Sequence, residues 1–241
     1  MQLLTDKSSL RIAWPKRLLL TCIISMMLIF AVRVIVAQGY LAGQAFGIAS
    51  VPGIRGTRTW ISANQVPSGH YGIAGLTGVC TTYSCGGSSV GYWETGWAKG
   101  QKTNNNLQMF AAWKVPNGGS DAFYGIASLQ GGVGYRYQTL FSNSAQRWEA
   151  WLGTVPKFYK YNLGFTSGNR ATCGGETLTA TPYDPDPPLS DACTETQYKT
   201  IYNNQWVYHT LTERQYFGPY CATNYQPTTL YFWGPVTSCS S

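Results

Sequence analysis

Charged residues are scarce in this chain of 241 residues, because Asp, Glu, Lys and Arg make up only 11% of it. Globular proteins usually carry about a quarter. A chain so poor in charge, with 44% hydrophobic residues, is neither disordered nor a coiled coil. A sustained apolar period of about 3.6 residues is also absent, which argues against amphipathic helices. The apolar surface must therefore be buried by another kind of element.

Motifs that hold nucleotides or metals are absent as well. Phosphate-cradling loops, dinucleotide-binding fingerprints and heptads do not occur, and this excludes nucleotide or flavin chemistry. The cysteines lack the close pairs or neighbouring histidines of a zinc site, since His70 and His209 are the only histidines. The aspartates in the proline-rich loop 181–192 match no calcium-binding spacing. We therefore expect no metal and no cofactor.

Glycine and aromatic residues are abundant, with 27 Gly, 17 Tyr and 9 Trp, as is typical of turns and half-buried strands. Runs with period-two alternation recur between glycine- or asparagine-rich turns. The expected strands are Thr57 to Ala63, Tyr71 to Val79, Ser89 to Ala98, Leu107 to Val115, Phe123 to Leu129, Gly134 to Phe141, Arg147 to Gly153, Lys157 to Phe165, Gly175 to Ala180, Gln205 to Leu211 and Thr229 to Trp233. A single sheet of about this size would curl or split. The pattern predicts an all-β protein, a two-sheet antiparallel β-sandwich of jelly-roll or concanavalin-like type.

The N-terminus has the shape of a secretory signal. Basic residues precede Leu18 to Val32, a run without charge that would reach only about 22 Å as a helix, short of the roughly 30 Å of a bilayer core. We expect residues 1–37 to be a signal peptide cleaved after Ala37, with an uncleaved membrane anchor as the alternative. In either case the remainder is secreted or extracellular.

The formal charge of +7 arises largely in this segment. Five basic residues and one acidic residue precede position 38, which leaves 12 basic and 9 acidic residues and a net charge of +3. We therefore expect no nucleic-acid partner, and contact with a membrane only through the N-terminal segment.

Six cysteines remain outside the signal, an even number that indicates disulfides in an exported protein. Short loops favour sequential pairing: Cys80 with Cys85, Cys173 with Cys193, and Cys221 with Cys239. Residues 38–54 have few strand signals and are expected to form a loose leader. Residues 55–241 are then one disulfide-supported β-sandwich domain.

Strand phase singles out Glu94. In the run VGYWETGW, Trp93, Thr95 and Trp97 share one face, and Tyr92 and Glu94 share the other. If the tryptophans are inside, Glu94 points outward with Tyr92, into the groove of a curved sheet. If they are outside, Glu94 lies between the sheets and must be paired or protonated.

Aromatic residues occur on both faces of several strands, more than a two-layer core needs. Exposed aromatic rings stack on sugar rings, which favours a secreted protein that binds polysaccharide or cell-envelope glycan through Tyr92, Trp97 and Trp151, with Glu94 beside them. The first alternative is a secreted hydrolase, a glycosidase or a peptidase, with Glu94 and Glu176 as a catalytic carboxyl pair. The second is a structural protein of the envelope.

The runs SVGYWETGWAKGQ, LQMFAAWKV, QRWEAWLG and LGFTSGNRATCGGET, between His70 and Thr177, resemble uncharacterised secreted bacterial β-sandwich proteins of concanavalin-like or jelly-roll outline. The resemblance implies fold and export. The order ETGW then AAWKVP is also similar to glutamic peptidases, sandwich enzymes that pair a glutamine with a glutamate. That similarity puts Glu94 in the first catalytic position and the second in Ala112 to Val115, where Lys114 is the nearest polar residue, so the dyad is not intact.

Overall fold

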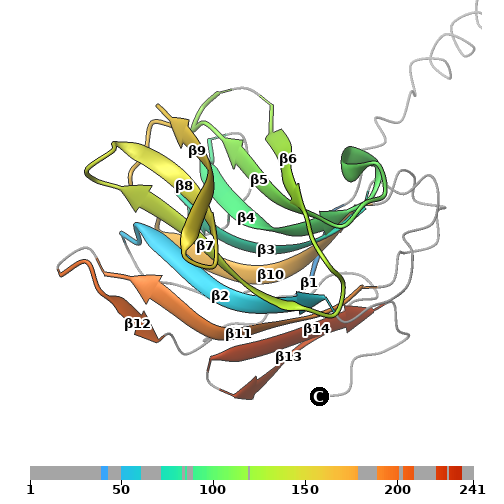
Figure 1. Ribbon diagram of the computed structural model, residues 1–241. Helices are drawn as coiled ribbons and strands as arrows, with labels where there is room; N and C mark the ends of the chain where they lie inside the picture. The colour runs from blue at the N-terminus through green and yellow to red at the C-terminus, as the bar shows by residue number, and fades with distance from the viewer. Residues whose placement is uncertain are drawn as a thin grey trace, which may run out of the picture. The chain divides into compact units, whose positions relative to one another are not determined.

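A computed structural model describes residues 39–42, 50–60, 72–82, 85, 89–118, 120–178, 189–200, 203–208, 221–226 and 228–234. These residues form two antiparallel sheets packed face to face (Figure 1). The predicted all-β sandwich is confirmed. None of the described helices is long and apolar enough to cross a membrane.

The six-stranded sheet has the order β1-β10-β3-β4-β5-β6. Its strands are β1 (Gly39–Ala42), β3 (Gly72–Cys80), β4 (Tyr92–Lys99), β5 (Gln108–Lys114), β6 (Ala122–Ser128) and β10 (Arg170–Leu178). A short 3-10 helix, η1 (Gln101–Thr103), lies in the connection between β4 and β5.

The eight-stranded sheet has the order β13-β14-β11-β2-β7-β8-β9, with β12 also paired to β11. Its strands are β2 (Gly53–Trp60), β7 (Gly134–Ser142), β8 (Arg147–Leu152), β9 (Val155–Tyr161), β11 (Leu189–Lys199), β12 (Trp206–Tyr208), β13 (Cys221–Gln226) and β14 (Thr229–Gly234).

Each expected strand overlaps an observed one, but β1, β11 and β13 were not predicted. The expectation of a loose leader over residues 38–54 is wrong for two of its parts. Gly39–Ala42 pairs with β10, and Gly53 already belongs to β2. The described residues all belong to one compact unit, Ala37–Ser241. The expected signal peptide lies outside the described residues.

Large aromatic side chains fill the space between the two sheets. Trp93, Trp97, Tyr137 and Trp148 are each at most 2% exposed and belong to one apolar cluster. Because β4 alternates, its tryptophans point into this core, and the next residues point away from it. The core therefore fixes which residues of β4 reach the opposite, outer face.

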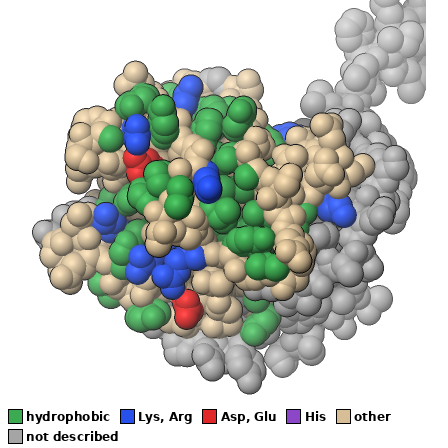
Figure 2. All heavy atoms as spheres, viewed as in Figure 1, with side chains coloured by type: hydrophobic (Ala, Val, Ile, Leu, Met, Phe, Trp, Pro, Cys, Tyr) green, Lys and Arg blue, Asp and Glu red, His purple; other side chains and the backbone are tan. Residues whose placement is uncertain are grey.

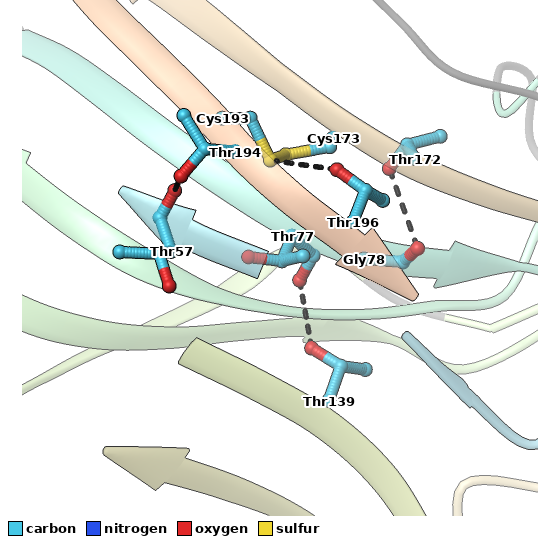
Figure 3. Close-up of a disulfide and its surroundings, with 9 residues drawn as sticks. All are labelled: Thr57, Thr77, Gly78, Thr139, Thr172, Cys173, Cys193, Thr194 and Thr196. Carbon is cyan, nitrogen blue, oxygen red and sulfur yellow. Dashed lines mark hydrogen bonds between the residues drawn. A yellow bond between two sulfur atoms is a disulfide. The ribbon is translucent and has the colours of Figure 1, made fainter. Parts of the chain in front are cut away.

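A disulfide and a threonine hydrogen bond connect the two sheets (Figure 3). Cys173 of β10 bonds Cys193 of β11, with 6.4 Å between the Cα atoms. The Thr139 hydroxyl of β7 donates to the Thr77 carbonyl of β3 at 2.7 Å. The sandwich is thus held by a covalent and a polar link as well as by apolar packing.

Two of the predicted disulfides are confirmed, Cys80 with Cys85 and Cys173 with Cys193. Cys221 is buried and disulfide-bonded. Its predicted partner, Cys239, lies outside the described residues, so that pairing stays a prediction.

Candidate active site

The position of Glu94 follows from the packing of β4. Trp93, Thr95 and Trp97 are 0%, 0% and 2% exposed between the sheets, so Tyr92 and Glu94 lie on the outer face of the six-stranded sheet. The sequence allowed the tryptophans of β4 to lie either inside or outside the sandwich, and the structure has them inside. Glu94 is only partly exposed on the outer face, so its carboxyl is poorly hydrated.

Small residues on the neighbouring strands make room for Glu94. In the sheet register Glu94 lies opposite Gly78 of β3 on one side and Ala112 of β5 on the other. A Cβ atom at Gly78 would lie 2.8 Å from Glu94 Cγ and 3.3 Å from Thr172 Oγ1. The glycine therefore allows the Glu94 side chain to lie across β3.

This close approach gives a test of the site. The substitution Gly78→Ala should displace Glu94 and lower any activity that depends on it by at least about tenfold, because misplacing a reacting group by about 1 Å is costly. Gly118→Ala is the matched control, since a Cβ atom there would meet its nearest neighbour at 3.5 Å. Equal activity of Gly78→Ala and Gly118→Ala would show that the activity does not depend on the position of Glu94.

Glu176 comes from β10 and lies on the same outer face as Glu94. Thr172 of β10 faces Gly78, and Gly78 faces Glu94, so Thr172, Gly174 and Glu176 alternate onto this face. The register places Glu176 beside Ala74, and Ala74 beside Ala98 of β4, so the two glutamates share this face two strands apart and four residues apart along the strand direction. That Glu94 and Glu176 act together as a pair stays a prediction.

The charge of Glu176 acts on the titration of Glu94. Burial, followed by the charges of Glu176 and Asp121, raises the pKa of Glu94 to about 8 from its ordinary value of 4.5. Burial also raises the pKa of Glu176, and Asp121 adds to this, but the positive charge of Lys102 opposes it. Glu94 is therefore protonated in neutral solution, and Glu176 is the carboxyl that a nearby cation helps to ionise.

Residues that sequence reasoning did not find complete the surroundings. Lys102 of η1 lies with its Nζ atom 5.2 Å from the centroid of the Phe123 ring. That ring stacks on Phe110 at 5.1 Å, and Ala98, Ala112 and Tyr92 pack in the same cluster. An apolar wall therefore lies beside Glu94. No local motif marks Lys102 or Phe123, because the pairing of β4, β5 and β6 positions them.

Two of the predicted glycan contacts do not belong to this site. Trp97 is 2% exposed in the core, so its assignment as a ligand contact is wrong. Trp151 is on β8 of the other sheet, where its indole N–H donates to Glu149 Oε2 at 3.0 Å. Tyr92 does lie on the face of Glu94, and burial followed by the charge of Glu94 raises its pKa. Within the described ranges, no His, Cys, Asp and Glu residues gather as a metal site would require.

The β-sandwich superposes on solved structures of glutamic peptidases. Scytalido-glutamic peptidase bound to a peptide-based transition-state analogue superposes with a TM-score of 0.56 and 12% identity, over 81% of this chain and 98% of that chain. SCP-B, a member of the eqolisin family of peptidases, bound to the tripeptide Ala-Ile-His, gives a TM-score of 0.50 and 10% identity, over 82% and 98%. No protein-family model matches the sequence, and a search of characterised proteins gives no significant match.

These likenesses establish that the chain has the fold of the glutamic peptidases, and the similarity noted in the sequence is confirmed at that level. Residues 112–115, where the sequence comparison found no second catalytic carboxyl, lie next to Glu94 in the sheet: Ala112 pairs with Glu94, and Lys114 lies 3.8 Å from Asp121. The carboxyls whose charges act on Glu94 are Glu176 of β10 and Asp121.

Proposed function

We propose that the protein is a hydrolase that cleaves peptide bonds with Glu94 and Glu176. The observation that carries the proposal is that the charge of Glu176 acts on Glu94, which lies with it on the outer face of one sheet. The fold is that of peptidases, and SCP-B holds the tripeptide Ala-Ile-His. The apolar wall of Phe110 and Phe123 beside Glu94 suits a peptide with apolar side chains.

Glu176 is assigned the role of general base: burial raises its pKa, as suits a base that works near neutral pH, and the charge of Lys102 favours its ionised form. Its carboxylate takes a proton from a water molecule while the water oxygen bonds to the substrate carbonyl carbon. The bond from that carbon to nitrogen then breaks, and Glu176 returns the proton to the leaving amine. Water and peptide thereby give a carboxylic acid and an amine, and the enzyme is unchanged.

Glu94 is assigned the role of a neutral hydrogen-bond donor. With a pKa of about 8 it keeps its proton in acidic and neutral solution. A protonated carboxyl offers one O–H donor beside an acceptor oxygen, much as a glutamine amide offers an N–H donor beside one. Its O–H can bond the substrate oxygen as negative charge develops there. The glutamine of the glutamic peptidases is thus replaced here by a protonated glutamate.

The proposal includes export, as predicted from the N-terminal segment. The disulfides within the described residues, Cys80 with Cys85 and Cys173 with Cys193, support it, because disulfides persist in oxidising compartments. An exported peptidase meets proteins outside the cytoplasm, and unfolded proteins are therefore suitable substrates for a first assay.

Two variants of Glu94 test its role. Glu94→Ala removes the donor and should lower kcat on an unfolded protein substrate by about 100-fold or more. Glu94→Gln retains a neutral donor, so its activity should stay within about tenfold of wild type below pH 7. It should also lose the alkaline fall in rate that the wild-type pKa of about 8 causes.

The measurement is a pH–rate profile from 3 to 10 for the three proteins, with cleavage products identified by mass spectrometry. If Glu94→Gln is as inactive as Glu94→Ala, then Glu94 does more than donate a hydrogen bond, and its assigned role is wrong. If Glu94→Ala cleaves as fast as wild type, the site itself is misassigned.

A further inference from the structure

Two cations converge on one aromatic ring, on the outer face of the eight-stranded sheet. The guanidinium carbon of Arg55 lies 4.4 Å from the centroid of the Trp206 ring, and Lys199 Nζ lies 5.7 Å from the same centroid. Arg55 comes from β2, Lys199 from β11 and Trp206 from β12. Register pairs Lys199 with Trp206, so the sheet itself builds this cluster.

Arg55 is held rigidly in the cluster. Its Nε atom donates to Gln197 Oε1 at 2.6 Å, across the register pair of β2 and β11. Because Nε is bonded and the ring covers one face of the guanidinium, the remaining N–H donors can still point to solvent. Tyr208, which is 61% exposed, pairs with Gln197 in the register and borders the cluster.

The two cations have no carboxylate of their own among the described side chains. Arg136, on the same face, bonds Glu195 at 3.0 Å, and Arg147 bonds Glu149 at 2.8 Å. Each glutamate on this face is therefore already engaged with an arginine. The positive charges of Arg55 and Lys199 are left without such an engagement.

The clustering has an electrostatic cost. Burial, followed by the charge of Arg136, lowers the pKa of Arg55. Burial, followed by the charge of Arg55, lowers the pKa of Lys199, and the negative charge of Glu149 opposes this only in part. A bound anion would relieve this repulsion.

Figure 2 shows the side of the molecule on which β2, β7 and β9 lie in front, where blue Lys and Arg side chains outnumber red Asp and Glu.

We propose that Arg55, Lys199 and Trp206 form a binding site for an acidic polysaccharide. The carboxylate or sulfate of one sugar residue would lie between the two cations. The faces of neighbouring sugar rings would stack on Trp206 and Tyr208, as apolar C–H surfaces pack on aromatic rings. This site does not depend on the proposed peptidase activity.

The chemistry favours a polysaccharide over the other large polyanions. Duplex DNA and anionic membranes are bound by many spread cations that face a dense array of phosphates. Here two cations without an ion-pair partner among the described side chains stand at one place, flanked by flat rings and an amide, which fits one anionic sugar within a chain. The site lies on the sheet opposite to that of Glu94, so a bound polysaccharide would leave the carboxyl face open to a peptide.

Binding of the purified protein to immobilised polygalacturonate, measured by biolayer interferometry at 50 mM salt, tests this site. Lys199→Gln and Trp206→Ala should each weaken binding by at least about tenfold, and binding should fall steeply between 50 and 300 mM salt. Lys160→Gln is the matched control, because it removes the same charge from β9 of the same sheet and should change binding less than twofold. Melting temperatures identify any variant that fails to fold.

Several results would overturn the proposal. They are equal binding by Lys199→Gln and Lys160→Gln, equal binding to a neutral glucan, and tighter binding to duplex DNA or to phosphatidylserine vesicles. Arg55→Lys keeps the charge and should retain most of the binding, which separates charge from folding if Arg55→Gln does not fold. Cleavage of a soluble peptide should be unchanged in Lys199→Gln, so failure of this site and failure of the peptidase assignment are distinguishable.

Discussion

Replacing Glu176 by glutamine should lower kcat for peptide cleavage by about 100- to 10,000-fold, the usual contribution of a general base. The amide that replaces the carboxylate cannot accept a proton from water, yet it is nearly the same size. The fold should be retained, because Glu176 sits on an outer sheet face and is not part of the apolar core. The assay is hydrolysis of an unfolded protein at pH 5 to 7.

The matched control is Glu195→Gln, an identical change on the other sheet, where Glu195 bonds Arg136 at 3.0 Å. Its rate should stay within twofold of wild type. If Glu176→Gln and Glu195→Gln have the same rate, then Glu176 is not the base. If both lose activity together with their melting temperature, the loss is one of folding.

The free energy of unfolding should fall as the pH rises from about 5 to 8. The pKa of Glu94 is about 8 in the folded protein and near 4.5 in the unfolded chain. Between these values the folded state keeps a proton that the unfolded state has released, so raising the pH favours unfolding. One such group contributes at most about 1.4 kcal/mol per pH unit. The raised pKa of Glu176 acts in the same direction.

In the Glu94→Gln variant this dependence should be much flatter. The variant should match wild type near pH 4 and be clearly more stable than wild type at pH 8, where wild type is losing the Glu94 proton. Urea unfolding at each half pH unit measures the effect, with Glu195→Gln as control. Parallel curves for wild type and Glu94→Gln would mean that Glu94 titrates like an ordinary surface carboxyl.

Alternating apolar residues predicted most of the strands, but not every strand carries that alternation. β11 lies between β2 and β14 in its sheet, yet its buried positions include Thr196 and Gln197. These polar side chains are buried because they find partners: Thr196 lies 3.4 Å from Cys193 Sγ, and Gln197 accepts from Arg55. The sequence pattern could not reveal such partners, since they come from distant strands.

The candidate site was predictable only in part for the same reason. The period-two alternation of β4 predicted that Glu94 lies on the face opposite to the tryptophans. Glu176 was the preferred partner because it, like Glu94, lies in a strand segment rich in glycine and aromatic residues. The contributions of Lys102 and Asp121 depend on how β5 and β6 add to the sheet, and these residues carry no local motif. Trp97 was misassigned because period-two alternation gives two faces without saying which one is core.

The decisive experiment is a carboxyl NMR titration of Glu94 and Glu176 in the purified protein. We expect one carboxyl that titrates near pH 8 and disappears in Glu94→Gln. We also expect that Glu176 titrates above its ordinary value and that its pKa rises further in Lys102→Gln. If both carboxyls titrate near 4.5 and neither responds to the other's substitution, the coupled pair does not exist and the peptidase assignment fails with it.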